Sequence, residues 1–147
     1  MKLSKLLSKV AIKNTIGDLD LEITNIHSDS RKIKEGGLFV AINGFAKNGT
    51  EFIPSAIENG AKAIIVEPNV DIHSLKISSE IPVISVQNTR KALALISCEF
   101  YGHPSKKLKL IGVTGTKGKT TTTFMIKSIL EQHGLKVRIN WKHCCLY

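Results

Sequence analysis

A glycine-rich run near the end of the chain constrains the fold more than any other feature. It reads Val-Thr-Gly-Thr-Lys-Gly-Lys-Thr-Thr over residues 113–121. An apolar segment, residues 108–113, precedes it and predicts a strand. Apolar side chains at helical spacing follow it and predict a helix from about Lys119 to Gly134. A strand, a glycine-rich turn and a helix in this order are typical of a loop whose backbone N–H groups hold phosphate.

The residue types in this loop suit a nucleoside triphosphate. Glycines let the backbone turn sharply and approach phosphate oxygens closely, and the start of a helix adds about half a positive charge. We expect the ammonium of Lys119 to reach the β- and γ-phosphates of ATP and the hydroxyl of Thr120 to coordinate Mg²⁺. The expected ATP-binding residues are Gly115, Thr116, Lys117, Gly118, Lys119, Thr120 and Thr121.

The spacing of the loop departs from the common phosphate-binding pattern. That pattern, G-x-x-x-x-G-K-[ST], requires a glycine five places before Gly118, and the residue there is Val113. Gly112 lies one place too early. The generic pattern therefore does not identify the loop, and a surface turn rich in glycine and threonine is the alternative.

Upstream of the loop, predicted strands alternate with predicted helices. We expect a break between two domains at Gly-His-Pro-Ser, residues 102–105, which precedes a cluster of lysines. The alternation predicts an α/β fold with a largely parallel sheet: a small mixed α/β domain, then the start of a P-loop ATPase domain. The expected strands are residues 21–26, 38–42, 63–66 and 82–86. Three helices are expected: residues 3–10, a helix with Pro54 in its first turn that ends at Gly60, and a helix capped by Thr89.

Composition narrows the possible partners. The formal charge is +9, but the lysines are dispersed and only 5% of the residues are aromatic, which disfavours nucleic acid. Anionic small molecules or ordinary solvated surface explain the charge equally well. No apolar run approaches the roughly 20 residues of a membrane span, no signal peptide is evident, and no CxxC pair indicates zinc. We expect a cytoplasmic monomer that binds neither membrane nor nucleic acid.

The variant loop, with its Thr-Gly-Thr-Lys-Gly-Lys followed by four threonines, resembles the ATP loop of the Mur ligases. Within that family it is most similar to the members that add the third amino acid to UDP-N-acetylmuramoyl-L-alanyl-D-glutamate. Lys117 stands where these members usually have asparagine. The sister ligases that add D-Ala-D-Ala more often have serine in place of Thr116.

A second block supports the resemblance. Ser-Asp-Ser-Arg at residues 28–31, Gly-Gly-Leu-Phe-Val-Ala at 36–41 and Gly44 are similar to the family's N-terminal domain, which holds the uridine nucleotide of the substrate. The resemblance implies that Ser28 and Ser30 contact the uridine diphosphate end, with Phe45, Ala46 and Lys47 along the same ligand. The residues alone leave another possibility, in which Ser30 and Arg31 only cap a turn.

The resemblance implies domains and an activity. Residues 1–105 correspond to the UDP-substrate domain and 106–137 to the start of the central ATP-binding domain. The family uses ATP and Mg²⁺ in peptidoglycan precursor synthesis to activate a carboxylate as an acyl phosphate, which the amine of meso-diaminopimelate or L-lysine attacks. Catalytic residues would lie beyond Tyr147.

Residues 138–147 leave the family pattern, as expected after a frameshift or a truncation, so we expect this chain alone to be an inactive fragment of a ligase. The alternatives are a non-catalytic module that binds a UDP-sugar nucleotide, the sister D-Ala-D-Ala ligase, or an unrelated P-loop NTPase.

Overall fold

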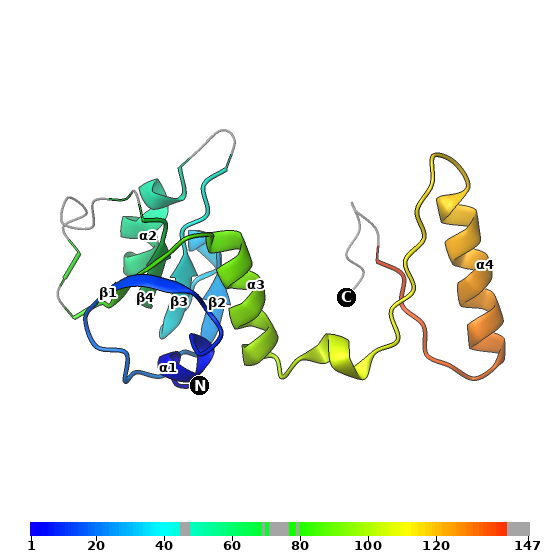
Figure 1. Ribbon diagram of the computed structural model, residues 1–147, viewed down its shortest axis with the longest axis horizontal. Helices are drawn as coiled ribbons and strands as arrows, with labels where there is room; N and C mark the ends of the chain where they lie inside the picture. Colours follow the sequence, from blue (N-terminus) through cyan, green and yellow to red (C-terminus); the bar gives the residue numbers. More distant parts are fainter. Residues whose placement is uncertain (45–47, 69, 71–76, 79, 141–147) are drawn as a thin grey trace. The chain divides into compact units, whose positions relative to one another are not determined.

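The computed structural model describes residues 1–44, 48–68, 70, 77–78 and 80–140. It divides into two compact units, Met1–Lys107 and Leu108–Tyr147. The first, unit 1, contains a five-stranded sheet, whereas the described part of the second, unit 2, contains one helix (Figure 1). Among the described residues, no helix has the length and apolar character that a bilayer crossing requires.

The sheet of unit 1 has the strand order β1-β5-β4-β3-β2. Strands β2 to β5 run parallel, and β1 joins β5 antiparallel at one edge. This confirms the predicted α/β fold with a largely parallel sheet. The strands are β1 Ile12–Ile16, β2 Asn25–His27, β3 Gly37–Val40, β4 Ala61–Val66 and β5 Val83–Val86.

The sheet is buried on both faces, which explains why its central strands read as continuous apolar runs. Side chains alternate between the faces along each strand. On β3, Leu38 and Val40 pack with helices α1 (Leu3–Leu6) and α3 (Thr89–Phe100), while Phe39 packs on the opposite face with α2 (Ile53–Glu58). Unit 1 therefore has a core on each side of the sheet.

The helix boundaries follow local signals in most places. Pro54 lies in the first turn of α2, and Gly60 follows the end of this helix with a φ of 99°. The prediction that Thr89 caps α3 was wrong. Asn88 is the N-cap, and its side chain accepts a hydrogen bond from the backbone N–H of Lys91 at 2.9 Å. Thr89 is the first helical residue and is completely buried.

The predicted strand at residues 21–26 was largely wrong. Only Asn25–His27 joins the sheet as β2. The preceding residues bond instead to the chain start, where the N–H of Leu3 donates to the carbonyl of Leu21 and the N–H of Ile23 to that of Met1. The sequence also gave no sign of β1, an edge strand with mostly exposed side chains.

Unit 2 contains α4 (Lys119–Gln132) after the glycine-rich loop. The helix was predicted correctly, but the strand predicted at residues 108–113 does not form. A strand requires a hydrogen-bonded neighbour, and no described residue pairs with this segment. Its apolar side chains are exposed, with Leu108 at 62% and Leu110 at 76%. Short 3-10 helices complete the chain: η1 Ser30–Lys32, η2 Gly49–Phe52 and η4 Pro104–Lys107.

Candidate functional site

The glycine-rich loop reaches α4 through two backbone conformations that favour glycine. The φ of Gly115 is 153° and that of Gly118 is 77°. A Cβ on Gly118 would meet nothing within 4 Å. This glycine is therefore required by its backbone conformation rather than by crowding within the chain. Gly118 is the N-cap of α4 and provides no side-chain cap, so the first N–H groups of the helix stay available for an external acceptor.

Lys119, the first residue of α4, lies over the loop that precedes it. Its ammonium donates a short hydrogen bond to the carbonyl of Gly115 and a longer one, 3.5 Å, to the carbonyl of Thr116. The side chain is exposed. The structure thus brings the predicted lysine to the predicted glycine turn, where phosphate oxygens would compete with the two carbonyls for its N–H donors.

The threonines after Lys119 differ in their contacts. The hydroxyl of Thr123 donates to the carbonyl of Lys119 at 2.7 Å, a bond internal to the helix. Thr120 and Thr121 are exposed in the first turn, as is Lys117 in the loop. Across the described residues, no three His, Cys, Asp or Glu side chains cluster closely enough to hold a metal ion. The expectation of Mg²⁺ therefore depends on the hydroxyl of Thr120.

The predicted uridine block lies at the carboxyl end of β2. Ser28 follows the strand directly and is exposed, whereas Ser30 begins η1 and is only 5% exposed. Asp29 caps η1 by accepting from the N–H of Arg31 at 3.1 Å, and its carboxylate also binds the Arg31 guanidinium at 2.9 Å. This pair lowers the pKa of Asp29 to about 2. Turn capping is thus the role of Asp29, and Ser28 is the serine open to a ligand.

The other predicted uridine contacts, Phe45, Ala46 and Lys47, lie outside the described residues. On either side of them, the structure shows polar contacts that sequence reasoning missed. Asn43 bonds to Glu67 and to Gly49. Glu67 directly follows β4, and the rule that ligands bind at the carboxyl ends of parallel strands could have drawn attention to it.

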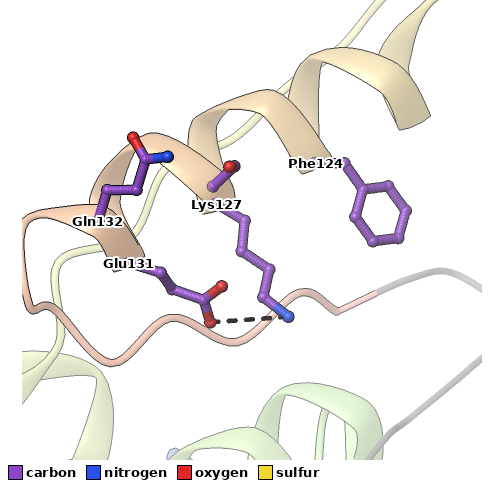
Figure 2. Close-up of a pocket in the computed structure, with 5 residues that line it drawn as sticks. Phe124, Lys127, Glu131 and Gln132 are labelled. Carbon is purple, nitrogen blue, oxygen red and sulfur yellow. Dashed lines mark ion pairs between the residues drawn. The ribbon is translucent and has the colours of Figure 1, made fainter.

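A hollow on the surface of α4 does not coincide with the phosphate-type loop (Figure 2). All of its lining residues come from this one helix, and Lys127 pairs with Glu131 across it at 3.7 Å. Because a single helix forms its whole wall, the hollow is too open to surround a ligand. The lining residues are Phe124, Lys127, Ser128, Glu131 and Gln132.

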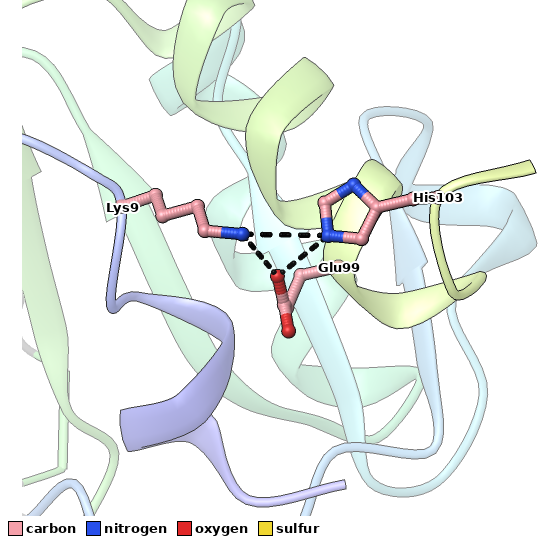
Figure 3. Close-up of polar contacts among 3 residues, drawn as sticks. All are labelled: Lys9, Glu99 and His103. Carbon is pink, nitrogen blue, oxygen red and sulfur yellow. Dashed lines mark hydrogen bonds and ion pairs between the residues drawn. The ribbon is translucent and has the colours of Figure 1, made fainter. Parts of the chain in front are cut away.

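Three charged or polar side chains tie the segment after α1 to the end of α3 (Figure 3). The carboxylate of Glu99 lies 3.0 Å from the ammonium of Lys9 and 3.0 Å from Nε2 of His103. The hydrogen bond from Lys9, followed by that from His103, lowers the pKa of Glu99. Glu99 and His103 of the cluster lie just before η4 in the chain, and none of its residues belongs to either predicted ligand site.

These features define a class of protein: an α/β protein whose parallel strand ends carry polar residues, followed by a glycine-rich loop and helix of the phosphate-binding type. A sequence model described as "Mur ligase family, catalytic domain" matches residues 22–101, more than half of the chain. The chain belongs to the Mur ligase family.

The similar proteins are ligases. The chain is 49% identical to the UDP-N-acetylmuramoyl-L-alanyl-D-glutamate–2,6-diaminopimelate ligase of Clostridium tetani over 93% of its own length and 28% of that protein. A crystal structure of MurF from Acinetobacter baumannii matches 75% of this chain and 22% of its own, with a TM-score of 0.55 and 34% identity. MurF ligase from Thermotoga maritima in complex with ADP matches 74% of this chain and 23% of its own, with a TM-score of 0.52 and 31% identity. The chain spans less than a third of the length of these relatives.

Proposed function

We propose that this chain provides the uridine-nucleotide domain and the ATP-phosphate loop for the ATP-dependent addition of 2,6-diaminopimelate to UDP-N-acetylmuramoyl-L-alanyl-D-glutamate. This reaction is a cytoplasmic step of peptidoglycan precursor synthesis. The observation that carries the proposal is the 49% identity, over 93% of this chain, to a protein named for that reaction. Identity is lower, at 34%, to a solved UDP-N-acetylmuramoylalanyl-D-glutamyl-2,6-diaminopimelate–D-alanyl-D-alanyl ligase from Acinetobacter baumannii. This difference favours addition of the third residue over the sister reaction with D-Ala-D-Ala.

Unit 1 is the proposed binding domain for the uridine nucleotide. The exposed hydroxyl of Ser28 is at the carboxyl end of a parallel strand, where open α/β sheets bind ligands. It can donate to a pyrimidine carbonyl or a phosphate oxygen. Ser30 is proposed to line the same site through its turn, although its burial makes it the less accessible of the two. Phe45, Ala46 and Lys47 remain proposed contacts.

The loop of unit 2 is the proposed site for the ATP phosphates. The uncapped first turn of α4, the ammonium of Lys119 and the hydroxyl of Thr120 fit a Mg²⁺-bound triphosphate. ATP, when bound, supplies the phosphoryl group that activates the substrate carboxylate. Lys119 neutralises phosphate charge, Thr120 offers the metal an oxygen ligand, and Gly115 and Gly118 hold the backbone N–H groups in position.

The uridine site is tested by titrating the purified 147-residue chain with UDP-N-acetylmuramoyl-L-alanyl-D-glutamate in a calorimeter. We expect one binding site, and we expect Ser28→Ala to weaken binding up to about tenfold, the effect of one strong hydrogen bond. Ser8→Ala, at an exposed serine after α1, is the matched control and should leave the affinity unchanged. A folded protein that does not bind this ligand would overturn the assignment.

The ATP site is tested separately with Mg²⁺-ADP. Lys119→Ala should weaken binding by at least about tenfold, because it removes the only lysine bonded to the loop carbonyls among the described residues. Lys127→Ala removes a charge from the same helix, where it pairs with Glu131, and serves as the control. Equal losses in the two variants would show that the effect is one of net charge and not of the loop.

A further inference from the structure

A polar cluster joins the carboxyl ends of three parallel strands in unit 1. Its members are Asn43 after β3, Glu67 after β4, and Thr89 and Arg90 after β5. We call them the edge cluster. Glu67 accepts from the side-chain amide of Asn43 at 3.1 Å and from the hydroxyl of Thr89 at 3.2 Å. The guanidinium of Arg90 donates to the backbone carbonyl of Asn43 at 2.9 Å.

These contacts converge on Asn43. Its side chain bonds to Glu67 through the amide N–H and accepts from the backbone N–H of Gly49 at 3.2 Å, while its own carbonyl accepts from Arg90. A Cβ on Gly49 would come within 2.5 Å of the carbonyl oxygen of Ile42. The backbones at 41–42 and at Gly49 are thus in close contact, and the side chain of Asn43 bonds to the N–H of Gly49 beside this contact.

The edge cluster does more than give the buried hydroxyl of Thr89 a hydrogen-bond partner. Thr89 is completely buried and gains a partner from Glu67, but Arg90 is exposed and has no need of a protein acceptor. Ordering its long side chain on a backbone carbonyl costs conformational entropy. The bond holds the backbone of Asn43, which follows β3, and β3 is the parallel neighbour of β2, with Phe39 paired to His27.

We propose that the edge cluster positions the backbone after β3 for the uridine end of the substrate, so that Arg90, Glu67 and Thr89 act on the ligand through Asn43 without touching it. This inference rests on the proposed function, because it assumes that the ligand lies at the carboxyl ends of β2 and β3. It makes Asn43, Glu67, Thr89 and Arg90 positioning residues.

The first test uses Arg90→Ala, because an exposed arginine can be removed without harm to the core. Affinity is measured for UDP-N-acetylmuramoyl-L-alanyl-D-glutamate by calorimetry and for uridine by NMR titration. Loss of one hydrogen bond should weaken both ligands by about the same factor, roughly fivefold. Lys62→Ala removes one charge at the opposite end of β4 and should change neither affinity.

Three outcomes would contradict parts of the account in different ways. Wild-type affinity in Arg90→Ala would overturn the positioning role and leave the proposed function standing. A loss confined to the diphosphate ligand would also overturn it, because Arg90 would then contact phosphate directly. Failure of the wild-type protein to bind either ligand would overturn the proposed function and, with it, the substrate role of the edge cluster.

The second test uses the buried end of the cluster. Thr89→Val keeps the shape of the side chain but removes the hydroxyl that binds Glu67, whereas Thr89→Ser keeps the hydroxyl. We expect Thr89→Val to weaken the binding of both ligands and Thr89→Ser to retain most of the affinity. Unfolding midpoints recorded in parallel separate this effect from lost stability. Equal affinities in Thr89→Val and Thr89→Ser would contradict the inference.

Discussion

Unit 1 and unit 2 contain similar apolar residues but use them differently. Within the described part of the chain, every buried hydrophobic side chain belongs to unit 1. In unit 2, Ile126 and Leu130 of α4 are partly buried, and none of the described apolar side chains is fully buried. Seven large ones are at least half exposed: Leu108, Leu110, Ile111, Phe124, Met125, Ile129 and Leu135. The same residue types therefore build a core in one unit and remain on the surface in the other.

The difference separates two kinds of binding site. The proposed uridine site lies on a sheet that is packed on both faces, so its strand ends are held in place before a ligand arrives. The phosphate-type loop has local structure only: two glycine conformations and a helix of 14 residues without a side-chain N-cap. Isolated helices of this length are marginal in water. We therefore expect the loop to gain order from its ligand, whereas unit 1 does not require one.

The largest predicted effect compares two phenylalanines. Phe39 on β3 is completely buried, and Phe124 on α4 is 52% exposed. Phe39→Ala should cost about 3 to 5 kcal/mol in the free energy of unfolding of unit 1, because it removes a core ring and leaves a cavity. Phe124→Ala should stay within about 0.5 kcal/mol. Urea denaturation followed by circular dichroism measures both, and comparable costs would break the comparison between the units.

The next effect compares two glycines with positive φ. Gly60 has a φ of 99°, and a Cβ there would lie 2.7 Å from Cα of Glu35, whereas Gly118 has a φ of 77° and open space around it. Gly60→Ala adds a backbone clash to conformational strain and should cost about 2 kcal/mol or more. Gly118→Ala should cost about 1 kcal/mol. Unfolding of unit 1 measures the effect of Gly60→Ala, and the helicity of α4 measures that of Gly118→Ala. A larger free-energy cost for Gly118→Ala than for Gly60→Ala would contradict the structure.

A smaller effect concerns helix capping. Asn88 caps α3 through its side chain, whereas the N-cap of α4 is a glycine with no side-chain bond. Asn88→Ala should cost about 1 kcal/mol, because the N–H of Lys91 loses its acceptor. Asn88→Asp keeps an acceptor and should cost little. If the alanine and aspartate variants were equally stable, the assigned cap would be wrong.

The smallest effect depends on pH. The pKa of Glu99 is lowered from its ordinary value of 4.5 by Lys9 and His103. A lowered pKa in the folded state stabilises the protein above the unfolded value, and this stabilisation disappears as the pH falls through the folded value. The Tm of wild type should exceed that of Glu99→Gln at pH 7, and the difference should shrink as the pH falls below 4.5. A difference that does not change with pH would contradict this assignment.

The sequence predicted the parts of the fold that local patterns determine. The apolar runs at β3, β4 and β5 identified buried parallel strands, and Pro54 and Gly60 delimited α2. It failed at β1, where an exposed edge strand forms because Ile12 pairs with Val86. It also failed at residues 21–23, because their partners are at the chain start. Both failures depend on distant pairing, which spacing along the chain does not reveal.

The candidate sites also divide into residues that local sequence patterns reveal and residues that only the fold brings together. The loop at Lys119 and the block at Ser28 were found because their residues are adjacent in sequence. The edge cluster was missed, because Asn43 is separated from Glu67 by 24 residues and from Arg90 by 47. Only the meeting of parallel strand ends brings these side chains together. Local motifs predicted the residues proposed to touch ligands, and the fold was needed to find those that hold them in place.

The most direct test of the account is an NMR titration of the ¹⁵N-labelled 147-residue chain with UDP-N-acetylmuramoyl-L-alanyl-D-glutamate. We expect saturable shifts at the amides of Ser28 and Asn43 and unchanged amides along α4, because the proposed uridine site belongs to unit 1 alone. Shifts confined to the loop and α4, or no shifts from a folded protein, would contradict it.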